Sequence, residues 1–322
     1  MKIVMTGATG LIGRSLCRSL ADDGHSVVAL SRKPEDVRGL AAAAAYKWDP
    51  LAGPPPLEAL QDAEAVIHLA GEPIAARRWT KEQKRRIRDS RVISTRNLIE
   101  GLRQAAPKPL SLISGSAIGF YGSRGDEVLD ENSPAGTGFL TDVCLEWETE
   151  AERAIGLPIR VVRVRTGVVL SPDGGALKKM LPAFKLGVAG PLGSGRQWFS
   201  WIHIADMVGI LRHALFSPTI AGPINATAPE PVTNAEFTRE LARVLHRPAF
   251  LRAPEFALRL AMGEMADMLL GSQRVIPKIA QQSGYKFQFQ TLRRALEALL
   301  GDETEVESEK KTRAAAGNKE TD

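Results

Sequence analysis

The sequence predicts an α/β fold: a Rossmann-like doubly wound parallel sheet with a smaller α-rich C-terminal lobe on the substrate side. Three observations support this prediction. A short apolar run at residues 2–5 leads directly into a glycine-rich turn at residues 6–13, and apolar residues then recur at helical spacing. A second apolar run, at residues 26–30, follows at the distance expected of a βαβ unit. Strand-like and helix-like segments continue to alternate after it, which is typical of a parallel sheet covered by helices.

The turn at residues 6–13 is typical of a dinucleotide-binding site. Gly7 permits a tight turn after the strand, Gly10 lets a pyrophosphate approach the backbone, and Gly13 allows the helix to pack close to the sheet. The free N–H groups at the start of the helix favour phosphates. We therefore predict that the turn binds a dinucleotide; the alternative is a glycine turn that serves the fold alone.

The end of the second predicted strand indicates which dinucleotide is bound. Ser31 and Arg32 stand where this fold faces the adenosine ribose, and the strand end carries no acidic residue. An acid at this point binds the 2′-hydroxyl of NAD, whereas an arginine accommodates the 2′-phosphate of NADP. The predicted cofactor is NADP(H); the alternative is that Arg32 is an ordinary surface cation.

Composition restricts the class of protein. The 322 residues, 44% of them hydrophobic, can form one large domain or two modest ones. Cys17 and Cys144 form neither a disulfide framework nor a metal-ligand cluster, so we expect a reducing, cytoplasmic compartment and no metal. The first strand starts at residue 2, and there is no apolar run of about 18 residues, so we expect neither a signal peptide nor a membrane span. The net charge of +5 suits an anionic ligand or solubility equally well, and we find no nucleic-acid-binding motif.

The remaining elements follow in order along the chain. Helices are predicted at residues 41–45, from Thr80, at residues 139–154 and 177–186, and from Thr233. Thr80 with Gln83, and Thr233 with Glu236, have the spacing of a capping box. Strands are predicted at residues 63–71, 110–114 and 158–170, from residue 202, and at residues 285–289.

These elements suggest three regions. Residues 1–170 are predicted to form an NADP-binding Rossmann domain, to which the chain returns at about residues 201–228. Residues 171–300 are predicted to form a substrate-side lid and an α-rich C-terminal segment, because residues 171–201 are rich in glycine and tryptophan. Residues 301–322 are charged and polar, which predicts a disordered tail.

The motifs, taken in order, resemble the extended and atypical short-chain dehydrogenase/reductases. The glycine turn, His68-Leu69-Ala70-Gly71, the stretch at residues 114–122 and the stretch at residues 201–206 match that pattern. More narrowly, the segments GEPIAARRW, RTGVVLSPDGG, PLGSGRQ and WIHIADM resemble the atypical "epimerase family", which carries a SulA-type, cell-division-inhibitor-like label and its own C-terminal segment. The resemblance covers residues 1–300, approximately.

The resemblance implies a set of cofactor contacts on this chain. They fall on Gly7, Thr9, Gly10, Leu11, Ile12, Gly13, Ser31, Arg32, Leu69, Ala70, Gly71, Arg91 and Val169. Arg91 is the basic residue of its predicted helix that we expect to reach the cofactor, although a solvated helix face explains the other cations there.

Catalytic members of that family use a Tyr and a Lys four residues later, and the Tyr passes a proton to the substrate while hydride moves. Residues 139–146, where the spacing places this pair, contain neither. The candidate replacements are Ser116 and Tyr121, for which the alternative is a packing role. The candidate substrate contacts are Glu72, Arg196, Trp201 and His203, and for His203 the alternative is a structural histidine.

Three functions agree with this pattern. The first is an NADP-dependent oxidoreductase acting on a small carbonyl or hydroxyl substrate with non-standard proton-transfer residues. The second is a cofactor-binding regulatory or scaffold protein, linked to cell division as the family label suggests. The third is a nucleotide-sugar epimerase, against which Phe199 stands where such enzymes carry a diphosphate-binding arginine. We expect a small-molecule substrate and no nucleic-acid or membrane partner; a homodimer is compatible with the sequence.

Overall fold

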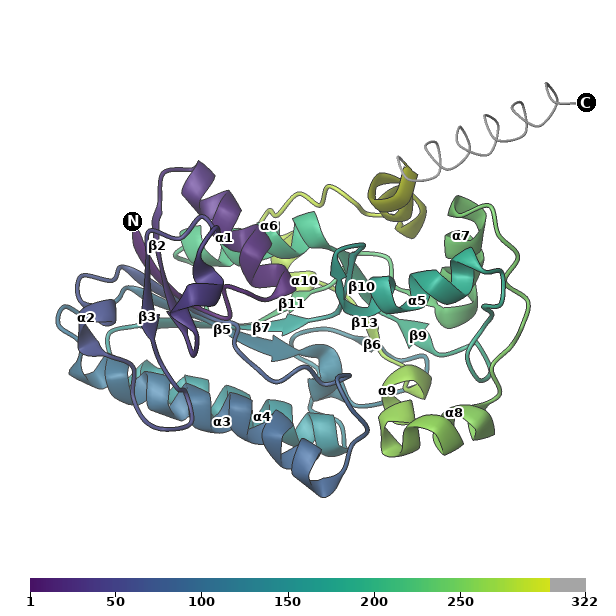
Figure 1. Cartoon of the computed structure of the whole chain (residues 1–322), viewed down its shortest axis with the longest axis horizontal. Helices are drawn as coiled ribbons and strands as arrows, with labels where there is room; N and C mark the ends of the chain where they lie inside the picture. The colour runs from purple at the N-terminus through teal and green to yellow at the C-terminus, as the bar shows by residue number, and fades with distance from the viewer. Residues whose placement is uncertain (302–322) are drawn as a thin grey trace, which may run out of the picture.

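The computed structural model describes residues 1–301 of the chain. Its centre is a seven-stranded sheet with the order β11-β7-β5-β4-β1-β2-β3 (Figure 1), and every neighbouring pair is parallel. The strands are β1 (Lys2–Thr6), β2 (Ser26–Ser31), β3 (Ala44–Lys47), β4 (Ala65–His68), β5 (Ser111–Ala117), β7 (Arg160–Thr166) and β11 (Gly222–Ala226). The predicted doubly wound parallel sheet is confirmed.

Helices cover both faces of this sheet. Figure 1 shows α1 (Leu11–Asp22) and α6 (Ile204–Phe216) above it, and α3 (Lys81–Gln104) and α4 (Phe139–Glu152) below it. Ile3 and Met5 of β1 belong to the apolar core on the side of α1 and α6, whereas Val4 belongs to the core on the side of α3 and α4. The alternation follows from the two-residue repeat of a strand, which sends successive side chains to opposite faces.

A smaller lobe lies beyond one end of the strands. Its core surrounds Trp201 and Phe237 and includes side chains of α5 (Gly175–Lys185), α7 (Asn234–Val244) and a helix at residues 292–301. Short strands pair here as β8 (Val168–Ser171) with β10 (Trp201–His203), β9 (Trp198–Phe199) with β12 (Val232–Thr233), and β6 (Val128–Leu129) with β13 (Arg274–Val275). The other elements are η1 (Pro34–Val37), α2 (Leu57–Leu60), η2 (Ile118–Tyr121), η3 (Arg153–Gly156), α8 (Glu255–Met262), η4 (Gly263–Ala266), α9 (Asp267–Leu270) and α10 (Lys278–Gln282).

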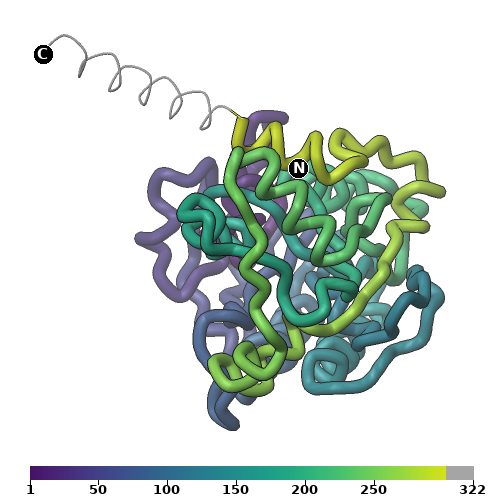
Figure 2. Tube along the Cα trace, turned by 90° about the vertical axis from the view of Figure 1, so that its right-hand side faces the viewer, coloured from purple at the N-terminus to yellow at the C-terminus, as the bar shows by residue number. Residues whose placement is uncertain are grey.

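The chain after α9 returns to the large sheet. Figure 2 shows it running from α9 at the bottom of the view to the helix at residues 292–301 at the top. Two buried carboxylates hold it: Glu131 Oε1 accepts from Ile279 N–H at 3.1 Å, and Asp206 accepts from the N–H groups of Gln288 and Phe289, both at 2.9 Å. Tyr285 Oη also donates to Asp206, at 2.9 Å.

Three predicted elements are corrected by the structure. The alanine-rich segment predicted as a helix at residues 41–45 leads into strand β3, because residues 44–47 pair with β2 at the sheet edge. The single strand predicted at residues 158–170 is two strands, since Gly167 separates β7 in the large sheet from β8, which pairs with β10. Residues 285–289 form no strand, because their N–H groups bond to Asp206 instead of a neighbouring strand.

Both predicted helix starts are confirmed. Thr80 caps α3 by accepting from Gln83 N–H at 3.1 Å, although the Gln83 side chain donates to Glu72 and not back to Thr80. Thr233 and Glu236 form the complete capping box at the start of α7. Within residues 1–301, none of the helices combines the length and the apolar character needed to cross a membrane. Apart from Gly301, the tail predicted to be disordered lies outside the described residues.

Candidate functional site

The glycine-rich turn between β1 and α1 lies where the strand order reverses, between β1 and β4. Open α/β sheets bind ligands at this point. Gly7 has φ +74°, and a Cβ on it would lie 2.8 Å from the carbonyl carbon of Leu69. A Cβ on Gly13 would lie 2.1 Å from the Gly7 oxygen, so only glycine fits at either position. Gly10 differs: it is exposed, and within the described chain a Cβ on it would meet Gly7 O alone, at 3.3 Å. The space above Gly10 is therefore open to a ligand.

Two other segments meet the glycine turn. Thr6 Oγ1 accepts from the N–H groups of Leu69 and Ala70, both at 3.1 Å, which fixes the backbone that follows β4 beside Gly7. On the other side, a Cβ on Gly174 would lie 3.3 Å from a methyl group of Leu11, at the start of α1. The loop after β8 therefore packs on the turn, and the structure brings these predicted cofactor residues together.

The end of β2 offers an unpaired cation beside this turn. Leu30 pairs with Thr6 in the sheet, so Ser31 and Arg32 follow at the same edge. The Ser31 hydroxyl donates to Lys33 O at 3.0 Å and shapes the bend. Arg32 is exposed and makes no hydrogen bond or ion pair with the described residues. Its guanidinium is free to bind an anionic group.

Arg91, a residue of α3 that we predict to reach the cofactor, lies beside the residues that follow β4. Its Nη1 donates to Glu72 O and Ile87 O, both at 3.0 Å, and a Cβ on Gly71 would lie 3.2 Å from its Cζ. Burial lowers the pKa of Arg91 below its usual value. Its Cζ is 5.3 Å from the centre of the Trp147 ring, and the buried Trp147 Nε1 has no hydrogen-bond partner among residues 1–301. N–H groups thus gather where β4 and β5 end.

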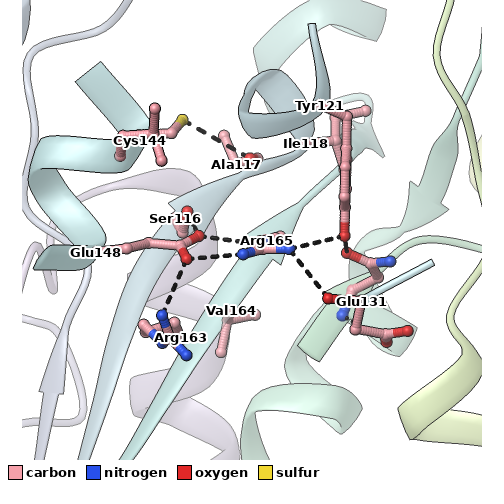
Figure 3. Close-up of polar contacts among 12 residues, drawn as sticks. Ser116, Ala117, Ile118, Tyr121, Glu131, Cys144, Glu148, Arg163, Val164 and Arg165 are labelled. Atoms are coloured by element: carbon pink, nitrogen blue, oxygen red, sulfur yellow. Dashed lines mark hydrogen bonds and ion pairs between the residues drawn. The ribbon is translucent and has the colours of Figure 1, made fainter. Parts of the chain in front are cut away.

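Ser116 and Tyr121, the predicted proton donors, lie in the protein interior (Figure 3). Ser116 Oγ donates to Glu148 Oε1 at 2.6 Å. Tyr121 is fully buried and its Oη donates to Asn225 Oδ1 at 2.7 Å. Burial, the largest effect, raises the pKa of Tyr121 to about 12. Both hydroxyls are therefore used in internal hydrogen bonds.

Glu148 and Arg165 were not among the residues singled out from the sequence. Arg165 Nε and Nη2 donate to Glu148 Oε1 and Oε2, at 2.8 and 2.9 Å, and Arg165 Nη1 donates to Tyr121 Oη at 3.0 Å (Figure 3). Arg163 Nη1 donates a fourth hydrogen bond to Glu148, at 3.3 Å, in addition to those from Arg165 and Ser116. The sequence signal that could have found them is the arginines placed among valines in the predicted strand. A charge in a buried strand requires a partner, so these arginines indicate a nearby carboxylate.

The face of α4 that packs on η2 is apolar apart from Thr141, whose hydroxyl donates to Gly119 O at 2.9 Å. A Cβ on Gly119 would lie 3.2 Å from Leu140 Cβ and 3.7 Å from Cys144 Sγ, so these two side chains, one turn apart, cover η2 just after the end of β5. Burial raises the pKa of the Cys144 thiol to about 12. This part of α4 therefore holds no group that exchanges a proton near neutral pH.

The four predicted substrate contacts separate in the structure. Glu72 is half-buried at the β4 edge, where its Oε1 accepts from Gln83 Nε2 at 3.2 Å. Arg196 is exposed in the loop before β9. Trp201 is fully buried and its indole donates to Glu230 O at 3.0 Å. His203 caps α6, accepting from Ala205 N–H at 3.0 Å. Trp201 and His203 are therefore placed as structural residues.

Comparison with protein-family models gives two matches. Residues 3–223 match the NAD dependent epimerase/dehydratase family, and residues 253–299 match DUF1731, a domain of unknown function. The first match runs from β1 to the start of β11 and so covers most of the large sheet, and the second covers the segment that returns to it.

Individual proteins match over nearly the whole chain. An epimerase family protein, the chloroplastic SDR39U1 homolog of Arabidopsis thaliana, is 40% identical over 311 residues, which cover 93% of this chain and 87% of that protein. The crystal structure of human epimerase family protein SDR39U1 (isoform 2) with NADPH is 36% identical, with a TM-score of 0.84, covering 93% of this chain and 99% of that chain. The nucleoside-diphosphate sugar epimerase of Corynebacterium glutamicum is 35% identical, with a TM-score of 0.75, covering 94% of this chain and 58% of that chain.

Proposed function

This chain belongs to the NAD dependent epimerase/dehydratase family, and from this premise we propose that it is an NADP(H)-dependent oxidoreductase acting on a small carbonyl or hydroxyl compound. The observation that carries the proposal is the glycine turn itself. Backbone atoms occupy the space that a Cβ on Gly7 or Gly13 would need, whereas the space above Gly10 is open, at the point where the strand order of the sheet reverses. We expect a pyrophosphate to bind in this space, beside the N–H groups that begin α1.

The choice of NADP(H) over NAD(H) rests on the end of β2. Arg32 is exposed and unpaired within the described residues, so its guanidinium can bind a 2′-phosphate without first breaking another ion pair. The human relative of 36% identity was crystallised with NADPH, in agreement with this choice.

When bound, the reduced cofactor supplies hydride to a carbonyl carbon. The residues of this chain bind and enclose it: the glycine turn holds the pyrophosphate, and Leu69, Ala70 and Arg91 form the wall at the end of β4. A proton must also reach the substrate oxygen. Ser116 and Tyr121 are bonded internally, so we assign the proton transfer to Glu72, a predicted substrate contact that is half-buried at the β4 edge.

A thermal shift with NADPH against NADH tests the cofactor. A ligand at about one hundred times its dissociation constant adds about 2.7 kcal/mol to the free energy of unfolding, which raises the Tm by several degrees. We expect this shift with NADPH, a much smaller shift with NADH, and a loss of the difference in Arg32→Ala. Arg18→Ala, which removes an exposed arginine of α1, is the matched control. No shift with either nucleotide would contradict the proposal.

Nucleotide-sugar epimerisation is the second candidate, favoured by the likeness to the nucleoside-diphosphate sugar epimerase of Corynebacterium glutamicum. The two reactions differ in their cofactor balance, because an epimerase returns its cofactor to the starting oxidation state, whereas a reductase consumes NADPH. Stoichiometric NADPH oxidation with a carbonyl substrate would support the first candidate. Sugar interconversion without net NADPH oxidation would support the second.

We further propose that the chain works in a reducing compartment such as the cytoplasm. Cys17 and Cys144 are both free and buried, and burial raises the pKa of each thiol. The Arabidopsis relative is described as chloroplastic, so the family is not restricted to one compartment. Retention of NADPH affinity in dithiothreitol agrees with this assignment, and a requirement for an oxidant would contradict it.

A further inference from the structure

A buried row of hydrogen bonds runs from Thr6 through His68 to α3, and the function proposed above gives it no role. Thr6, His68, Ser94 and Thr95 are all completely buried. They connect the last residue of β1, the last residue of β4 and the middle of α3. This chain lies directly against the turn after β4, because Thr6 also bonds to the backbone of that turn.

The partners of Thr6 fix the tautomer of His68. A hydroxyl has one hydrogen and two lone pairs. Thr6 Oγ1 accepts from Leu69 N–H and Ala70 N–H, both at 3.1 Å, so its own hydrogen is left for His68 Nδ1, which lies 2.7 Å away. Nδ1 is therefore the unprotonated nitrogen, and the hydrogen of the neutral ring is on Nε2.

The Nε2–H group of His68 points to two hydroxyls of α3. Thr95 Oγ1 lies 3.1 Å from Nε2, and Ser94 Oγ lies 3.3 Å from it. Each hydroxyl donates its own hydrogen to a helix carbonyl, Thr95 to Arg91 O at 2.6 Å and Ser94 to Ser90 O at 2.7 Å, so both can accept from His68. Burial lowers the pKa of His68 to about 4, which keeps the ring neutral near pH 7. Every donor in the chain thus has an acceptor.

We propose that His68 is a positioning residue for the cofactor site, holding both the turn after β4 and the turn of α3 that carries Arg91. This inference rests on the proposed binding of NADP(H). Through Thr6, His68 sets the backbone that a Cβ on Gly7 would approach to 2.8 Å, so a shift of this backbone changes the wall of the glycine turn. Through Thr95, it sets the carbonyl of Arg91 itself.

Two substitutions of His68 distinguish its link to Thr6 from its link to α3. The side-chain oxygen of His68→Asn takes the place of Nδ1 and keeps an acceptor for Thr6. The longer side chain of His68→Gln reaches the Nε2 position and keeps only the link to α3. We expect His68→Asn to bind NADPH within about three-fold of the unmodified chain, and His68→Gln to bind about ten-fold more weakly, the equivalent of one lost hydrogen bond.

Calorimetric titration with NADPH and the Tm of the free protein are measured for each variant. His213→Gln, which alters a half-buried histidine of α6 that bonds to Ser283, is the control for loss of an imidazole that lies away from the cofactor site. A purely structural role would lower the Tm of both His68 variants and leave both NADPH affinities equal to that of the unmodified chain, which would overturn the proposal.

If His68→Gln does not fold, Thr6→Val against Thr6→Ser tests the same link, because valine removes the hydroxyl and serine keeps it. Weaker NADPH binding by Thr6→Val alone supports the proposal, and equal binding by the two overturns it. Failure of the proposed function has a different signature: the unmodified chain would then show no NADPH binding, and this inference would fail with it.

Discussion

Arg165 and Glu148 form a two-point ion pair inside the protein, with N–O distances of 2.8 and 2.9 Å and side chains that are each 4% exposed. The pair joins β7 to α4. It also holds the two hydroxyls that the sequence suggested for catalysis, since Ser116 donates to Glu148 and Arg165 donates to Tyr121. The network therefore connects β5, η2, α4 and β7 in the protein interior.

Tyr121→Phe tests this interpretation. The substitution leaves Asn225 Oδ1 and one N–H of Arg165 without a partner in the interior, so we expect the free energy of unfolding to fall by about 1–3 kcal/mol. NADPH affinity should stay within about two-fold, as should any NADPH turnover. Urea unfolding and NADPH titration measure the two effects. Tyr46→Phe in β3 is the matched control. A large loss of turnover in a stably folded Tyr121→Phe would show that the Tyr121 hydroxyl takes part in catalysis.

Gly13→Ala should be the most damaging addition of one methyl group to the glycine turn. The new Cβ would lie 2.1 Å from Gly7 O, so the turn or the helix must move. We expect a loss of about 3 kcal/mol in the free energy of unfolding and loss of the NADPH-dependent shift in Tm. Gly156→Ala, where a Cβ would meet nothing within 4 Å, should change neither. Normal NADPH binding by Gly13→Ala would contradict the close packing described.

Acid should destabilise the protein before its carboxylates titrate. Burial lowers the pKa of His68 and of His203 to about 4 in the folded state. A histidine in the unfolded chain has a pKa of about 6.5, so the stability held by each neutral ring is complete above that pH and is lost as the pH falls toward 4. The loss is up to about 3 kcal/mol for each histidine.

His203→Asn tests one half of this loss. Asparagine keeps an acceptor for Ala205 N–H at the start of α6 and does not titrate. We expect its free energy of unfolding, measured in urea, to fall less between pH 7 and pH 4.5 than that of the unmodified chain. An identical pH dependence in the two proteins would show that His203 is not buried in its neutral form.

Lys179 connects α5 to the loop between β4 and α3, because its Nζ donates to Ala75 O at 2.7 Å. That loop follows Gly71 and Glu72 at the cofactor edge. We expect Lys179→Met to accelerate NADPH dissociation by about three- to ten-fold, since one charge-assisted hydrogen bond that closes the loop is removed. Stopped-flow displacement of NADPH measures the rate. Lys178→Met, whose Nζ donates to Asp173 O beside its own helix, should leave the rate unchanged.

Much of the large sheet could be predicted from sequence, because its strands are buried on both faces. β1, β2 and β4 are short apolar runs, and the glycine turn after β1 is set by local sterics that the glycines themselves reveal. The helix predicted at residues 41–45 was wrong because alanine's helix propensity is weak compared with pairing at a sheet edge. A weak local preference gives way to a contact with a distant strand.

The network at Glu148 could not be predicted for a similar reason. Ser116, Tyr121, Glu148 and Arg165 come from four different elements, and whether a hydroxyl faces a ligand or an internal carboxylate depends on which elements meet. The alternation at residues 285–289 predicted a strand that does not form. Its apolar residues face different cores: Tyr285 packs against the core on the side of α1, and Phe289 packs against the core of the smaller lobe.

The return of the C-terminal chain to Asp206 and Glu131 implies that the two regions matched by family models fold cooperatively. A truncated chain ending before residue 253 would leave the fully buried Asp206 carboxylate without Tyr285 Oη and without the N–H groups of Gln288 and Phe289. A buried charge without donors is strongly unfavourable. The segment that carries these donors is therefore a structural part of the nucleotide-binding half. Exchange of this segment for an unrelated one would require new hydrogen-bond donors for Asp206.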